Sequence, residues 1–268
     1  MKINPFIKWS GSKRSQAKEI VSYFPKSIDI YYEPFLGSGA VIGYLKPQKA
    51  VASDINKPLI ELWKELQKDP KSISNYYRKQ WNSLQKNGHT YFYKIRDKFN
   101  KEQSHMDFLF LTRTCVNGLI RYNKSGEFNN SLHHTRKGIH PDRLEKVIFE
   151  WSTVIQKYIF ENFDYKKTTQ HAKKGDFVYL DPPYFNTGTR YFGAIDHQEF
   201  IDYLSDLNKR GIRFALSYDG KRGEKSFMVD IPKNLYKKHI LIHSGNSTFN
   251  KVQNGKVEKV YESLYLNY

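Results

Sequence analysis

Short apolar runs alternate with helical patterns along most of this chain. Residues at 15–24, 55–66 and 197–209 carry apolar side chains at helical spacing. Strands are predicted at 28–33, 50–54, 159–163, 177–180, 212–217, 235–242 and 260–266. The strand at 177–180 is predicted to be buried, and the last has the alternation typical of an edge pair. Strands that alternate with helices predict an α/β fold with a doubly wound sheet.

Between residues 57 and 158 helical spacing dominates instead. Helices are predicted at 58–67, 72–84, 91–99, 106–117 and 143–158, and a polar β-hairpin with a Lys-Ser-Gly turn at 121–130. We therefore predict two domains, one formed by residues 1–56 with 159–268 and the other by residues 57–158.

The predicted hairpin and the basic stretch after it are rich in hydrogen-bond donors. Asn123, Lys124, Asn129 and Arg136 are residue types that suit phosphates and base edges. A helical insertion that displays one basic hairpin has the character of a recognition module, and a helical cap with a solvated loop is the alternative. The pair His133-His134 lacks a third ligand, so we predict no metal site there.

The most informative stretch is Val-Tyr-Leu-Asp-Pro-Pro-Tyr at 178–184. Two prolines cannot continue a central strand, so Asp181 is predicted at the carboxyl end of a strand, on a stiff turn. In open α/β sheets ligands bind at that end. A carboxylate, the carbonyl of Pro182 and the ring of Tyr184 suit a planar substrate with an exocyclic amine. A proline-rich turn with a solvated Asp is the alternative.

A strand, a glycine turn and a helix start follow one another near the N-terminus. Phe35, Gly37 and Gly39 form a Gly-x-Gly turn without the third glycine of the dinucleotide fingerprint, which argues against NAD. The next strand ends in Asp54, which is placed to bind a ribose diol or, alternatively, to cap the following helix.

A loop of small residues precedes the first predicted helix. Trp9 offers a flat face there, and Lys13 can bind a carboxylate or a phosphate. An ordinary helix start with a surface lysine is the alternative.

Composition adds the class of partner. The chain has 268 residues with 44 Lys and Arg against 27 Asp and Glu, a formal net charge of +17, which favours a polyanion. The single cysteine, Cys115, excludes an intrachain disulfide and a cysteine-clustered zinc site, and we expect it to be a buried small hydrophobe. No apolar run is long enough to span a membrane, so we expect a cytoplasmic protein without a membrane partner.

Taken together, these motifs resemble a known family. The order is Phe-Ile-Lys-Trp-Ser-Gly-Ser-Lys, Glu-Pro-Phe-Leu-Gly-Ser-Gly, Ser-Asp-Ile-Asn, Asn-Gly-Leu-Ile-Arg-Tyr-Asn with Gly-Glu-Phe-Asn, and Tyr-Leu-Asp-Pro-Pro-Tyr. It resembles the Dam-type DNA adenine-N6 methyltransferases of the D12 class, alpha group, over nearly the whole chain. The resemblance implies a Rossmann-like class I methyltransferase fold with a mixed sheet and an inserted, mainly helical target-recognition domain bearing a β-hairpin.

The resemblance also implies roles for single residues. Trp9 and Lys13 would contact S-adenosylmethionine, Lys13 at its carboxylate end. Phe35, Gly37 and Gly39 would line the cofactor pocket, and Asp54 would hold the ribose hydroxyls. Asp181 would lie between cofactor and target amine, with Pro182 accepting from that amine and Tyr184 stacking on a flipped adenine. Arg121 would read a base. Double-stranded DNA is the implied partner. A role beside a cognate restriction endonuclease and a solitary role both fit the resemblance.

Three departures from the family pattern concern the target sequence. Phe128-Asn129-Asn130-Ser131-Leu132 replaces the usual Phe-Asn-Val-Pro-aromatic run, Val116 replaces an aromatic residue, and Tyr218-Asp219 follows Ser217 where Ser-Asn is usual. We therefore make no assignment of GATC as the site. The competing functions are methylation of cytosine N4 in DNA, methylation of an amine in RNA, and DNA binding without catalysis.

Overall fold

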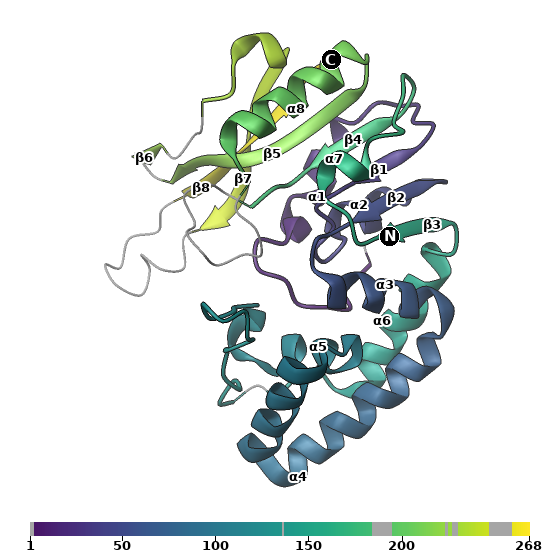
Figure 1. Ribbon diagram of the computed structural model, residues 1–268, viewed down its shortest axis with the longest axis vertical. Coiled ribbons are helices and arrows are strands. Elements are labelled where there is room, and N and C mark those ends of the chain that lie inside the picture. Colours follow the sequence, from purple (N-terminus) through teal and green to yellow (C-terminus); the bar gives the residue numbers. More distant parts are fainter. Residues whose placement is uncertain (1–2, 136, 184–194, 223–224, 227–229, 247–258) are drawn as a thin grey trace.

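A mixed β-sheet forms the upper half of the molecule (Figure 1). The computed structural model describes residues 3–135, 137–183, 195–222, 225–226, 230–246 and 259–268. The strands are β1 (Tyr31–Glu33), β2 (Ala50–Ser53), β3 (Tyr158–Glu161), β4 (Phe177–Leu180), β5 (Arg213–Arg222), β6 (Lys225–Ser226), β7 (Lys238–Asn246) and β8 (Lys259–Leu266). Their order is β3-β2-β1-β4-β5-β8-β7, with β6 paired to β5.

Two features of the sheet are its antiparallel strand β8 and a reversal of strand order at its centre. Strands β3, β2, β1, β4 and β5 are parallel, whereas β8 runs antiparallel to both β5 and β7. The chain goes from β1 outward to β2, and from β4 outward to β5 on the other side, so the order reverses between β1 and β4. A crevice at the carboxyl ends of those two strands is the expected ligand position of such a sheet.

Successive side chains of the central strands belong to two different layers of the core. Tyr31, Phe177 and Tyr179 belong to one buried cluster, and Tyr32 and Val178 belong to the other. Successive side chains of a strand point to opposite faces, so a strand that is buried throughout must be covered on both. The first cluster includes α1 (Ala17–Ser22) and α2 (Ala40–Leu45), and the second includes α7 (Tyr165–Thr168) and α8 (His197–Lys209).

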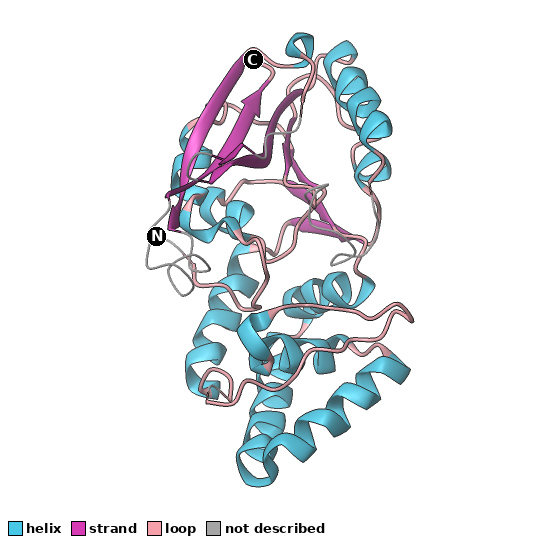
Figure 2. Cartoon of the chain, turned by 90° about the vertical axis from the view of Figure 1, so that its left-hand side faces the viewer, coloured by secondary structure: helices cyan, strands magenta, loops and turns pink. Residues whose placement is uncertain are grey.

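Helices make up most of the lower half of the molecule (Figures 1 and 2). They are α3 (Lys57–Lys68), α4 (Pro70–Glu102), α5 (His105–Thr114) and α6 (Pro141–Val154). The two predicted helices 72–84 and 91–99 both lie in α4, which is broken at Gly88, where φ is 61° and ψ is −142°. Only a residue without Cβ adopts that backbone at low cost, so Gly88 sets the bend.

Aromatic contacts join the two halves, and helices of the lower half hold the N-terminal segment by hydrogen bonds. Trp63 of α3 lies edge-on to Phe6 and Trp151, with ring centroids 4.6 and 5.0 Å apart. Arg113 of α5 donates to the carbonyl of Phe6 at 2.7 Å, and the Trp151 indole donates to the carbonyl of Asn4 at 2.8 Å. The segment that leads into the Trp9 loop is therefore held by helices of the insertion. The predicted domain boundary at residues 57 and 158 stays a prediction.

Most predicted elements are confirmed, and the errors concern their ends. The helix predicted at 106–117 ends at Thr114, because residues 116–118 form a 3₁₀ turn with Asn117 at φ 55°. The strand predicted at 235–242 begins at Lys238, after a 3₁₀ turn, and the strand predicted at 212–217 continues to Arg222. Cys115 is buried, as expected.

The hairpin at 121–130 is present in a minimal form. It has one antiparallel bridge, Tyr122 with Phe128, and the Asn123 amide donates to the Glu127 carbonyl at 2.9 Å. Asn100 of α4 clamps its base, accepting from the Phe128 amide at 2.8 Å and donating to the Phe128 carbonyl at 3.1 Å. Within the described part of the chain, no helix has the length and apolarity of a membrane span.

Candidate active site

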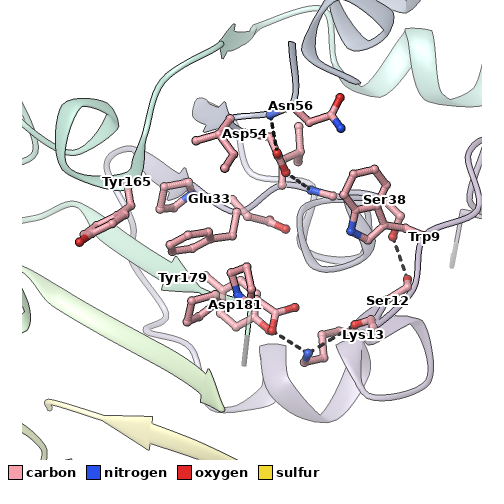
Figure 3. A pocket seen from close by; sticks show the side chains of 18 of the residues that line it. Trp9, Ser12, Lys13, Glu33, Ser38, Asp54, Asn56, Tyr165, Tyr179 and Asp181 are labelled. Carbon is pink, nitrogen blue, oxygen red and sulfur yellow. Dashed lines mark hydrogen bonds and ion pairs between the residues drawn. The ribbon is translucent and has the colours of Figure 1, made fainter. Parts of the chain in front are cut away.

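A cavity of about 340 Å³ lies where the strand order reverses, at the carboxyl ends of β1, β2 and β4 (Figure 3). Its walls come from the N-terminal loop, the glycine turn, the start of α7, the turn after β4 and the hairpin. Trp9, Lys13, Phe35, Gly37, Asp54, Asp181 and Pro182 all line it. Tyr184 lies outside the described residues.

The glycine turn is shaped by two left-handed backbones. Gly37 has φ 47° and Gly39 has φ 65°, and α2 begins directly after Gly39. A Cβ on Gly37 would lie 2.8 Å from the Trp9 indole nitrogen, and one on Gly39 would lie 2.9 Å from the Trp63 ring. Glycine is therefore required at both positions by backbone conformation and by close packing. Gly37 lines the cavity, whereas Gly39 lies behind it against Trp63.

Asp54 is fixed by backbone amides rather than acting as a helix cap. It accepts from the Gly37 amide at 3.2 Å and from the Asn56 amide at 2.9 Å. The cap of α3 is Asn56, whose side chain accepts from the Leu59 amide at 3.0 Å, so the capping alternative for Asp54 is wrong. Burial raises the pKa of Asp54 to about 6, although the hydrogen bonds from the Gly37 and Asn56 amides lower it.

Lys13 is not a surface lysine. Only 4% of its side chain is exposed, and its ammonium lies 2.6 Å from Asp181 and 3.4 Å from Glu262 of β8. The loop that carries it is tied to the glycine turn by a 2.8 Å hydrogen bond between the hydroxyls of Ser12 and Ser38. The short 3₁₀ helix at Lys13–Ser15 thus directs a cation into the turn after β4 (Figure 3).

Asp181 follows β4, a strand in which every residue is buried. Its side chain is 19% exposed, and Pro182 and Pro183 line the cavity beside it. Burial raises the pKa of Asp181 to about 6, and Lys13 opposes that shift. The solvated alternative for this carboxylate is therefore wrong.

Glu33 is a cavity carboxylate that the sequence motifs did not point to. Glu33, the last residue of β1, is 3% exposed, accepts from the Tyr31 hydroxyl at 2.7 Å and lines the cavity. Burial raises its pKa to about 8. An acidic residue at the end of a predicted strand marks Asp54 and Asp181 as site residues, and Glu33 has the same position in its strand.

Aromatic rings missed by the sequence complete the cavity. Tyr165, at the start of α7, stacks on Phe35 with centroids 5.6 Å apart and an interplanar angle of 26°. Tyr122 of the hairpin also lines the cavity and receives a hydrogen bond from Asn56 at 3.4 Å. Phe35 is therefore one half of a stacked pair, and the hairpin abuts the cavity directly.

The predicted recognition residues lie on the outer part of that hairpin. Arg121 is exposed and donates through Nε to the Asn129 side chain at 2.8 Å. The Asn123 side-chain oxygen accepts from two amides of the turn, those of Ser125 and Glu127, at 3.0 and 2.9 Å. Lys124 is exposed at the tip, whereas Arg136 lies outside the described residues. No group of three or more potential metal ligands occurs among the residues that the structure describes.

Known proteins similar to this chain point to one family. The model of the D12 class N6 adenine-specific DNA methyltransferases matches residues 9–250. The type II methyltransferase M.MjaIII of Methanocaldococcus jannaschii is 31% identical over 100% of both chains. The DNA adenine methylase of Vibrio cholerae is 30% identical over 92% of both chains.

Among solved structures, an rRNA methyltransferase of Streptomyces viridochromogenes, AviRa, aligns with 94% of this chain and 82% of its own at 12% identity and a TM-score of 0.42. The family match, which covers the glycine turn, the hairpin and the turn after β4, gives the assignment. This chain is a member of the D12 class N6 adenine-specific DNA methyltransferase family.

Proposed function

We propose that the chain transfers the methyl group of S-adenosylmethionine to N6 of an adenine flipped out of double-stranded DNA. The observation that carries this proposal is the cavity at the reversal point of the sheet, where Lys13, Asp54 and Asp181 meet beside a donor-rich hairpin. The net charge of +17 supports a DNA partner, because lysines and arginines displace the counterions of phosphates.

The residues that line the cavity fit such a methyl donor. The Gly37 turn admits a ligand close to the backbone, and Asp54 is an acceptor for a ribose diol. The stacked rings of Phe35 and Tyr165 offer an apolar wall for a purine. Lys13 is the cation for the donor's carboxylate, which would share it with Asp181 and Glu262, and Trp9 closes the cavity against Gly37. When bound, S-adenosylmethionine supplies an electrophilic methyl on a sulfonium.

Asp181 and Pro182 would position the acceptor. The N6 lone pair of adenine is delocalised into the ring, so the amine is a poor nucleophile. Hydrogen bonds from N6 to the Asp181 carboxylate and the Pro182 carbonyl draw the amine toward tetrahedral geometry. Catalysis then consists mainly of positioning and of preorganised polarity. Tyr184 is assigned to stacking on the flipped base, which offsets part of the few kcal/mol that unstacking costs.

The hairpin is assigned to sequence readout. Arg121 is the residue for a base edge, and Asn123, Lys124, Asn129 and Arg136 are assigned to DNA contacts. The hairpin's Tyr122 lines the cavity, so recognition and chemistry take place on adjacent surfaces. We further propose that the enzyme acts at the nucleoid and protects the site of a cognate restriction endonuclease, which the type II name of the Methanocaldococcus jannaschii relative favours.

The test is long-read modification mapping of DNA from a methylation-free host that expresses this chain. We expect N6-methyladenine in one recurring motif. N4-methylcytosine in its place, or modified RNA with unmodified DNA, would overturn the proposal. Cleavage of unmodified but not modified DNA by an extract of the source cells tests the endonuclease.

A further inference from the structure

Two carboxylates compete for one buried ammonium at the base of the cavity. Lys13 Nζ lies 2.6 Å from Asp181 and 3.4 Å from Glu262. Asp181 therefore holds the ammonium in a short, charge-assisted contact, while Glu262 is within ion-pair distance of the same cation. An oxygen of Asp181 that is bound to Lys13 has less electron density to offer to an amine N–H.

Glu262 is built to receive that ammonium. Its Oε2 is buried and makes no hydrogen bond among the described residues, although it is the oxygen that faces Lys13. That oxygen already forms an ion pair with Lys13 at 3.4 Å, and a small shift of the ammonium toward it would add a charge-assisted hydrogen bond.

The sheet brings Glu262 to this position by a local irregularity. The pairing of β5 with β8 shifts register between Tyr218 and Lys221. Gly220 lies in that interval, and a Cβ there would meet the Tyr261 carbonyl at 2.2 Å and the Glu262 Cα at 2.8 Å. Bulges commonly redirect a side chain beside an active site, and here the glycine lets β8 approach closely at Glu262.

We propose that Glu262 is a positioning residue for methyl transfer, which competes with Asp181 for Lys13 and so leaves Asp181 free to accept from the target amine. The inference rests on the proposed function. In the reaction the N6 lone pair would form the new bond to the methyl carbon while the carbon–sulfur bond breaks with its electrons on sulfur, and the proton that N6 loses would pass to the Asp181 carboxylate and from there to solvent. Glu262 touches neither reacting atom and acts through Lys13.

The charges around Asp181 determine the direction in which Glu262→Gln shifts the pH dependence. The titratable and charged groups that face Asp181 are Lys13, Glu33 of β1, Tyr179 of β4 and Glu262 of β8. Lys13 lowers the pKa of Asp181 and Glu262 raises it. Glu262→Gln therefore lowers that pKa and strengthens the contact between Lys13 and Asp181. In Glu262→Gln the acid limb of the pH–rate profile therefore moves to lower pH. Methyl transfer also slows, because Lys13 holds the Asp181 oxygen that should accept from N6 more firmly.

The experiment is single-turnover methyl transfer from labelled S-adenosylmethionine to a duplex with the mapped site, measured against pH. For Glu262→Gln we expect a plateau about tenfold slower, less than the hundredfold cost of a misplaced reacting group, and an acid limb displaced to lower pH. Glu19→Gln, an exposed carboxylate on α1, is the matched control and keeps the wild-type profile. A fall without a shift, or a shift without a fall, overturns the proposal.

A double-mutant cycle tests whether Glu262 acts through Lys13. In a Lys13→Gln background, Glu262→Gln is expected to change the plateau rate by less than twofold, since the shared ammonium is gone. An undiminished effect overturns the proposal. If Glu262→Gln does not fold, Glu262→Asp gives the same comparison with a retracted carboxylate. A wild-type chain that methylates no adenine would defeat the proposed function, whereas an active wild type with an unshifted Glu262→Gln profile defeats only this inference.

Discussion

The cavity and the hairpin meet at Tyr122, yet they are built in opposite ways. In the cavity, Glu33, Asp54 and Asp181 lie at the carboxyl ends of strands. Burial raises their pKa values to about 8, 6 and 6. On the hairpin, Arg121 is exposed and its hydrogen bonds go to nearby Asn129. The chemistry needs charges already removed from water, whereas readout needs donors that can exchange partners at little cost.

The largest effect should come from the cavity. Asp181→Ala removes the proposed acceptor for N6, and we expect methyl transfer to fall about a thousandfold or more. DNA binding should stay close to wild type, because the hairpin is untouched. Single-turnover assays and DNA titration measure the two quantities, with the exposed Asp97→Ala on α4 as control. Equal loss of both would remove Asp181 from this role.

The next prediction compares a glycine of each region. Gly39→Ala puts a Cβ 2.9 Å from Trp63 at φ 65°, whereas Gly126→Ala in the hairpin, at φ 76°, meets nothing within 4 Å. Both suffer backbone strain of about 1–3 kcal/mol, and only Gly39→Ala adds a steric clash. Chemical denaturation should show the larger loss of unfolding free energy for Gly39→Ala. Equal losses would mean that the Trp63 contact adds nothing.

The hairpin itself is tested by Arg121→Ala. We expect discrimination at one base pair to weaken by about 1–3 kcal/mol, if the arginine contacts guanine through two hydrogen bonds. Lys124→Ala at the tip should instead weaken binding to all sequences alike and lower the salt dependence. Competition binding with single-base variants of the mapped site separates the two. Unchanged preference in Arg121→Ala would count against base readout.

The smallest effect is a pH dependence of stability. The folded-state pKa of Glu33, about 8, lies above its ordinary value of 4.5. The stability that protonated Glu33 contributes is complete below about 4.5 and is lost as pH rises through about 8. Glu33→Gln should therefore raise the melting temperature at pH 8.5 by a few degrees and leave it nearly unchanged at pH 5. Glu19→Gln, which is exposed, should show the wild-type slope.

The sequence predicted most helices and strands, but not which distant side chains contact one another. The fully apolar run 177–180 could only be a buried strand, and the prolines after it fixed where it ends. Glu33 is the last residue of the strand that leads into the glycine turn, and the turn is the stronger local signal there. Lys13 was assigned to a ligand, and its pairing with Asp181 and Glu262 involves residues more than 160 positions away, which no local pattern reveals.

The sequence by itself determined the order of strands and helices, the position of the glycine turn and of Asp181, the basic hairpin, and through these the family. Periodicity, proline and glycine act over a few residues, so they can be read along the chain. Only the tertiary structure decided which strand ends meet, that Asn56 rather than Asp54 caps α3, and that Gly220 admits β8 close enough for Glu262 to reach Lys13. These depend on sheet order and register, which place residues from distant segments within a few ångströms of each other.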